Sequence, residues 1–194
     1  MIRGIIFDCF GVLCHGSLQY LRSITPPEHL QELGDLSHSS DYGYVSHTEY
    51  SQRVGALLGR SAQEIDEITG AQCIRDERAI ELVRSLRGDY KTALLSNIGR
   101  GRIDMLFTPE ELKGLFDAVV LSNEVGMVKP NATIYELAAS RLGLPADECI
   151  MIDDIAINVM AAEAAGMHGL QCKSAEQCEV DLRNMLGKTN ARVA

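Results

Sequence analysis

Polar residues that could do chemistry follow four apolar stretches of the sequence, close to the point where each stretch ends. They are Asp8, Ser96, Asn97, Lys129, Asp153 and Asp154. Short apolar stretches rich in β-branched residues are typical of buried strands in a parallel sheet. In an open α/β sheet, ligands bind at the carboxyl ends of the strands. We therefore expect these six side chains, which are far apart in the sequence, to meet in one crevice.

Three carboxylates, one ammonium group and one hydroxyl in a single crevice predict a site that binds a metal ion and an anion. Charged groups are costly to bury unless they are paired or coordinate a metal. Oxygen ligands without a cluster of His or Cys favour a hard divalent cation, and we expect Mg²⁺. The five histidines are scattered without metal-ligand spacing, although His15 and His38 could line the crevice.

The elements that must position these residues form an α/β pattern from Glu77 onward. We expect strands at residues 2–7, 90–95, 118–121, 149–152 and 169–171. Segments with helical spacing separate them, near residues 79–86, 100–107, 131–143 and 157–164; another begins at Thr108-Pro109, and a last helix opens at Ser174. Strands that alternate with helices predict a parallel sheet with right-handed crossovers and helices on both faces.

Residues 14–73 contain several helix starts and no convincing strand. Ser46 and Ser61 each stand three residues before a Glu, the capping-box pattern, which predicts helices near 47–58 and 62–72. Leucines before them suggest another helix or two, broken by Pro26 and Pro27, and residues 34–43 are typical of a loop. We therefore expect an α/β core domain of residues 1–14 and 76–194, with residues 15–75 as a helical cap domain above the carboxyl end of the sheet.

The composition narrows the classes of function. A net charge of -9 argues against nucleic acid as a partner, because phosphate binding needs clustered Lys and Arg. We find no apolar run long enough to span a membrane. Six cysteines without a C-x-x-C pair indicate reduced thiols and a cytoplasmic protein. The oligomeric state is left open.

In their order and positions, the polar residues resemble the four motifs of the haloacid dehalogenase (HAD) superfamily. The first motif, an aspartate followed by Gly-Thr/Val-Leu, matches Asp8 with residues 11–13. The second matches Ser96, the third matches Lys129 in a Lys-Pro pair, and the acidic fourth matches Asp153 and Asp154. The resemblance covers essentially the whole chain and implies a Rossmann-like core with a helical cap inserted after the first motif.

The resemblance implies a covalent mechanism and a magnesium site. Asp8 would be the nucleophile, attacking phosphorus to give an aspartyl phosphate that water then cleaves. Asp8 and Asp154 would hold Mg²⁺ together with the backbone carbonyl of Phe10. Asp153 would be the less certain ligand, which pairs with Lys129 or orients water.

The remaining motif residues would bind the phosphate and the rest of the substrate. Ser96 would donate to a phosphate oxygen, and Lys129 would offset the charge of the nucleophile and the phosphate. We expect Asn97 and Gly11 to contact the substrate. That substrate would be a small phosphorylated molecule.

Phe10 departs from the family pattern. Active phosphatases that the chain resembles usually carry a second aspartate at this position, which protonates the leaving oxygen and later deprotonates water. Phenylalanine can do neither, and such acid-base help is typically worth about 10²–10⁴-fold.

Three interpretations therefore remain. The first is a phosphatase restricted to better leaving groups, and the second is a 2-haloacid dehalogenase, in which halide departs without a proton. The acidic pair Asp153 and Asp154 weakens the second, because dehalogenases resemble the phosphatases elsewhere but lack this pair. The third is a protein that binds a metal or an anion without turnover and acts through a partner.

Overall fold

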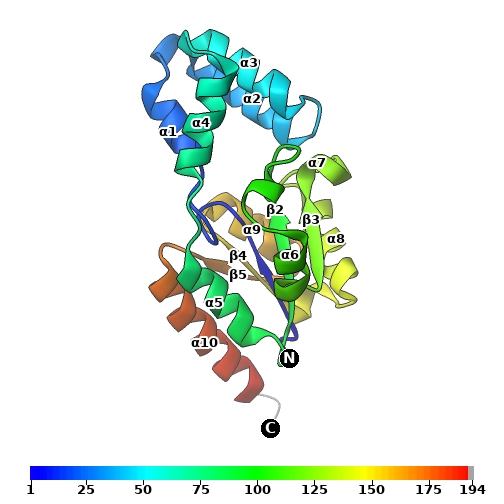
Figure 1. Ribbon diagram of the computed structural model, residues 1–194. Coiled ribbons are helices and arrows are strands. Elements are labelled where there is room, and N and C mark those ends of the chain that lie inside the picture. The colour runs from blue at the N-terminus through cyan, green and yellow to red at the C-terminus, as the bar shows by residue number, and fades with distance from the viewer. Residues whose placement is uncertain (192–194) are drawn as a thin grey trace.

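The computed structural model describes residues 1–191, with side chains through Gly187. Its strands form one parallel sheet in the order β3-β2-β1-β4-β5 (Figure 1). The strands are β1 (Gly4–Phe7), β2 (Lys91–Ser96), β3 (Ala118–Leu121), β4 (Cys149–Asp153) and β5 (His168–Gln171). The predicted parallel sheet is confirmed, and each strand lies within two residues of its expected bounds. β1 occupies the centre of the sheet, paired with β2 and β4.

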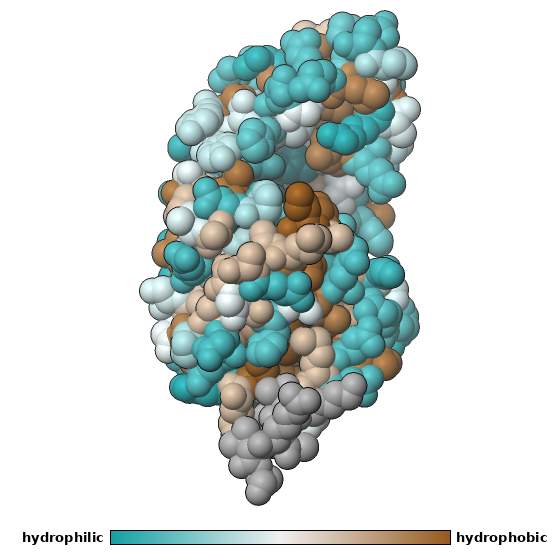
Figure 2. All heavy atoms as spheres, turned by 180° about the vertical axis from the view of Figure 1, so that it is seen from behind, coloured by the Kyte–Doolittle hydropathy of each residue, from teal (hydrophilic) through white to brown (hydrophobic). Residues whose placement is uncertain are grey.

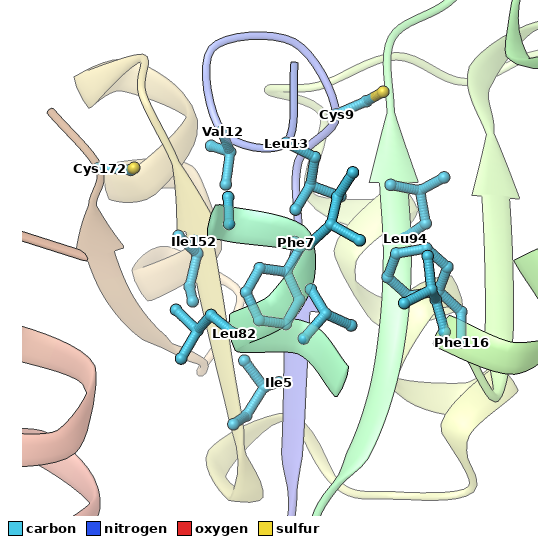
Figure 3. Close-up of a cluster of buried hydrophobic side chains, with 14 of the residues drawn as sticks. Ile5, Phe7, Cys9, Val12, Leu13, Leu82, Leu94, Phe116, Ile152 and Cys172 are labelled. Atoms are coloured by element: carbon cyan, nitrogen blue, oxygen red, sulfur yellow. The ribbon is translucent and has the colours of Figure 1, made fainter. Parts of the chain in front are cut away.

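Helices cover both faces of the sheet because alternate strand residues point to opposite sides. Ile5 and Phe7 pack against α5 (Glu77–Leu86) and α10 (Ala175–Ala191), as Figure 3 shows for Phe7 and Leu82. The short α6 (Pro109–Leu115) also covers this face. Ile6 points the other way, into a cluster with α8 (Ala132–Leu142) and α9 (Ala156–Ala164).

Residues 15–75, called the helical insert below, follow β1 in the chain and lie beyond the carboxyl end of the sheet (Figure 1). They form α1 (Leu18–Ile24), a 3₁₀ turn (Pro27–His29), α2 (Leu30–Asp41), α3 (His47–Leu58) and α4 (Ala62–Gln72). The insert has a hydrophobic cluster of its own, with Leu21, Leu33, Leu36, Val45, Tyr50, Val54 and Ile65. The predicted capping box of Ser61 and Glu64 is confirmed; Ser46 caps α3 through the backbone N–H of Glu49.

The loop predicted at residues 34–43 is wrong, because α2 continues through Asp41. Ser-rich sequence favours turns, since hydroxyls compete for backbone hydrogen bonds. Here Ser37 and Ser39 donate instead to the carbonyls four residues earlier, at 2.9 and 2.8 Å. Burial of Leu33, Leu36 and Ser40 on one face holds the helix against the rest of the insert.

Two further segments differ from expectation. The helix predicted near residues 100–107 is only a 3₁₀ turn (Ile103–Met105), and the chain also forms α7 (Ser122–Val125) and a 3₁₀ turn (Ala146–Glu148) that the sequence did not indicate. α9 forms where the spacing of Ile157 and Met160 predicts a helix, yet both side chains are exposed. Its buried side carries Asn158, Val159 and Ala162. Within residues 1–191, no helix is long and apolar enough to cross a bilayer.

Candidate functional site

The carboxyl ends of β1, β2 and β4 meet beneath the helical insert and border a cavity of about 620 Å³. The register places Phe7 beside Leu94 and Ile152, close to the carboxyl ends of β2 and β4, so the three strands end at the same edge of the sheet. Asp8, Asn97, Lys129 and Asp154 line the cavity from the sheet side. A hollow between the insert and the rest of the molecule is visible from behind (Figure 2).

Lys129 joins two of the strand-end carboxylates in a buried ion-pair cluster. Its Nζ lies 2.8 Å from Asp8 Oδ1 and 2.5 Å from Asp153 Oδ2. The Asp153 carboxylate also accepts two hydrogen bonds from Asn158 Nδ2, at 3.0 and 3.1 Å. All three ionic side chains are less than a tenth exposed, so their charges interact in a medium of low dielectric.

Burial dominates the proton affinities in this cluster. It raises the pKa of Asp8 to about 7; the positive charge of Lys129 opposes this effect, and the charge of Asp153 adds to it. Burial alone would lower the pKa of Lys129. Asp8 and Asp153 outweigh it, so the pKa of Lys129 lies above its ordinary value and the amine stays charged.

The acidic residues fit a divalent cation. Oxygen atoms of Asp8, Asp153 and Asp154 lie within 4.8 Å of one another. Asp154 Oδ1 is buried and accepts no hydrogen bond from the described residues, which leaves a costly free acceptor on a residue of this cluster. Carboxylate oxygens suit a hard divalent cation such as Mg²⁺, which proteins usually hold through one or two carboxylates.

Gly11 allows the Asp154 carboxylate to approach the backbone of the first loop. Its φ of +85° lies in the left-handed region, and a Cβ at this position would lie 2.3 Å from Asp154 Oδ2. Any larger side chain here would force the Asp154 carboxylate to move. Glycine is therefore required by both the turn and the acidic cluster.

Asn97 and Ser96 occupy the end of β2 in different ways. Asn97 Nδ2 donates to the Lys129 carbonyl at 3.0 Å, and its Oδ1 accepts from the Lys129 N–H at 2.8 Å. The amide thereby fixes the loop that carries Lys129. Ser96 is fully buried and is absent from the cavity lining, and its Oγ has one long contact of 3.5 Å, to the Asn97 carbonyl.

Residues of the insert complete the cavity, and several were not singled out from the sequence. Asp41, Arg22 and Tyr50 line it from the insert, and Arg102 lines it from the loop after β2. His15 lines it as expected, whereas His38 does not. Asp41 was missed because its segment was predicted as a loop; the Leu33, Leu36 and Ser40 spacing is the signal that could have extended the helix to it.

Comparisons with known proteins agree with this geometry. Residues 2–166 match the haloacid dehalogenase-like hydrolase family. The chain is 28% identical, over 95% of its length and 97% of the relative, to sesquiterpene phosphatase astK of Aspergillus oryzae. It is 22% identical over 99% of its length to drimenol cyclase drtB of Aspergillus calidoustus, and it spans 38% of that protein.

A solved structure supports the same fold. A HAD family enzyme from Bacteroides thetaiotaomicron, in complex with magnesium and inorganic phosphate, superposes with a TM-score of 0.73 at 20% identity, over 88% of this chain and 94% of the other. The family match over residues 2–166 establishes that this chain is a member of the haloacid dehalogenase-like hydrolases.

Proposed function

We propose that the protein is a magnesium-dependent phosphatase that works through an aspartyl phosphate on Asp8. The observation that carries the proposal is the strand-end cluster, in which Asp8 is ion-paired to Lys129 and lies beside an unsatisfied oxygen of Asp154. Phosphoryl transfer through a covalent intermediate uses a nucleophilic carboxylate, a positively charged side chain held in place and an oxygen that can coordinate a metal ion.

In the first step an oxygen of Asp8 attacks phosphorus, the ester P–O bond breaks, and the leaving oxygen takes a proton. In the second step water attacks the aspartyl phosphate and releases inorganic phosphate, which regenerates Asp8. Lys129 stabilises the negative charge in both steps, and Asn97 holds the Lys129 loop in place. The poorly bonded Ser96 hydroxyl, beside this loop, would donate to a phosphate oxygen.

Asp8, Asp154 and the backbone carbonyl of Phe10 would hold Mg²⁺. Asp153 is already bonded to Lys129 and Asn158, so it would help to orient the groups around the ion instead of coordinating it directly. The ion, when bound, supplies positive charge that lets an anionic phosphate approach the anionic nucleophile.

We further propose that residues 15–75 act as a cap domain that selects the substrate. Phe10, Leu18, Ile98 and Ile155 give the cavity an apolar part next to the phosphate end. Together with the relative named as a sesquiterpene phosphatase, this lining supports a monophosphate ester with an apolar organic group.

The test is phosphate release from farnesyl phosphate, n-octyl phosphate and glucose 1-phosphate, with Mg²⁺ or with EDTA. We expect release that EDTA abolishes and that Asp8→Asn loses, with the apolar esters preferred. The control is Asp89→Asn, an exposed carboxylate at the opposite end of the sheet, which should keep full activity. Activity that persists in Asp8→Asn, or halide release from 2-chloropropionate in EDTA, would overturn the proposal.

A further inference from the structure

Position 10, in the loop directly after Asp8, carries no group that can move a proton. Phe10 stands two residues after Asp8 and lines the cavity with an apolar ring. An alkyl phosphate must nevertheless lose its alcohol, and an alkoxide is a poor leaving group without a proton donor. A second acid in the same cavity would solve this problem.

Asp41 is such an acid, and it comes from the helical insert. It is the last residue of α2 and lines the cavity together with Asp8 and Lys129. Its carboxyl group accepts no hydrogen bond from the described residues, although the charges of Lys129 and Arg102 act on it. The carboxyl group is therefore available to a ligand in the cavity.

The end of α2 is hydrogen-bonded to the first residue of α7, which follows β3 directly, and the segment after it is hydrogen-bonded to the loop after β2. Ser122 Oγ donates to the Asp41 carbonyl at 2.6 Å and accepts from the Ile98 N–H at 2.9 Å. Arg100 Nε donates to the Gly43 carbonyl at 3.1 Å, close behind. These bonds hold Asp41 at a fixed place relative to the loop after β2, where the phosphate would bind.

From this placement we infer that Asp41 is the general acid and base of the reaction, in the role that Phe10 cannot fill. The inference rests on the proposed phosphatase activity. Asp41 gives its proton to the leaving oxygen as the ester P–O bond breaks. The resulting carboxylate then takes a proton from the water that attacks the aspartyl phosphate, so the second step restores the acid.

The surroundings of Asp41 suit both steps. Burial raises its pKa to about 7, while Lys129 and Arg102 pull in the opposite direction. A group with a pKa near neutrality is populated in both its acid and its base form at the working pH. The other charged or titratable side chains that line the cavity from the insert are His15, Arg22 and Tyr50.

The experiment compares two substrates with the Asp41→Asn variant and Mg²⁺. For n-octyl phosphate, whose leaving group needs a proton, kcat/KM should fall by about 10²–10⁴-fold. For p-nitrophenyl phosphate, whose leaving group does not, kcat/KM should stay within a few fold because it reports only the first step. Its kcat should fall, with a burst of p-nitrophenolate equal to the enzyme concentration, because the second step has lost its base.

Asp35→Asn is the matched control, since Asp35 lies on the same helix and is exposed. It should leave both substrates unchanged. The double variant Phe10→Asp with Asp41→Asn should recover n-octyl phosphate turnover, because it returns an acid to the first loop.

Equal losses of kcat/KM for both substrates, or no loss at all, in Asp41→Asn would overturn the inference while the phosphatase proposal stands. A wild-type protein that releases no phosphate from either ester would overturn both.

Discussion

Replacing Lys129 with methionine should destabilise the protein by about 3–5 kcal/mol at pH 8 in the presence of EDTA. Lys129 Nζ is 2.8 Å from Asp8 Oδ1 and 2.5 Å from Asp153 Oδ2, and the lysine side chain is 1% exposed. Methionine fills a similar volume but carries no charge. Two buried carboxylates would then face each other without a cation, and the cost of an uncompensated buried charge sets the magnitude.

The loss should shrink as the pH falls. Burial already raises the pKa of Asp8 to about 7, and removal of the cation raises it further. Between pH 8 and pH 5 the folded variant therefore binds a proton that the unfolded chain, whose Asp has an ordinary pKa, does not bind. The stability of the variant consequently rises as the pH falls from 8 toward 5.

Urea denaturation at pH 8 and pH 5 measures both effects, since a shifted midpoint with an unchanged slope reports stability alone. Lys113→Met, at an exposed lysine of α6, is the control and should change the free energy of unfolding by less than about 0.5 kcal/mol. Adding Asp153→Asn to Lys129→Met should restore part of the loss. A loss below about 1 kcal/mol, or one independent of pH, would refute the picture of two buried carboxylates neutralised by one amine.

Three further predictions concern the same cavity. Gly11→Ala should weaken Mg²⁺ binding, measured by calorimetry, because the new Cβ would lie 2.3 Å from Asp154 Oδ2 and the φ of +85° costs about 1–2 kcal/mol for an L-residue; unchanged affinity would contradict the close approach. Mg²⁺ at 100 times its dissociation constant should stabilise the wild-type protein by about 2.7 kcal/mol and Asp154→Asn far less, as thermal melts would show; equal shifts would exclude Asp154 as a ligand. In EDTA, Asp41→Asn should raise stability by about 1–2 kcal/mol at pH 8 and by nothing at pH 4. In the folded wild-type protein the pKa of Asp41 is raised to about 7, which favours the neutral acid, so the wild type loses stability as the pH rises toward 7. A gain in stability of Asp41→Asn at pH 4 would contradict this direction.

The sheet and the strand-end residues were predictable because short-range signals and topology agree. Apolar stretches mark β1 and β4, and a parallel sheet brings Asp8 and Asp153 to the same edge whatever lies between them. The structure does bring the two carboxylates together, through Lys129. Their proposed catalytic and metal-binding roles stay predictions.

The insert side of the cavity was not predictable in the same way. The extent of α2 depends on burial of Leu33 and Leu36 against other helices, which outweighs the preference of serine for turns, so Asp41 was not recognised. Likewise, spacing alone indicated α9 but not its orientation. The polar Asn158 is turned inward because it bonds the Asp153 carboxylate, which leaves Met160 in solvent.

The central place of β1 affects how the molecule is made. β1 is synthesised before the other strands of the sheet, and its two partners are strands whose last residues are Ser96 and Asp153. One edge of β1 stays uncovered until Ser96 has been synthesised and the other until Asp153 has been, while the insert can form its own cluster from neighbouring segments earlier. Non-local strand pairing is slow to form and exposes unpaired edges to aggregation. Asp8, the proposed nucleophile, therefore remains outside a formed site until Asp153 has been synthesised, and we expect chains that end before this residue to carry Asp8 without activity.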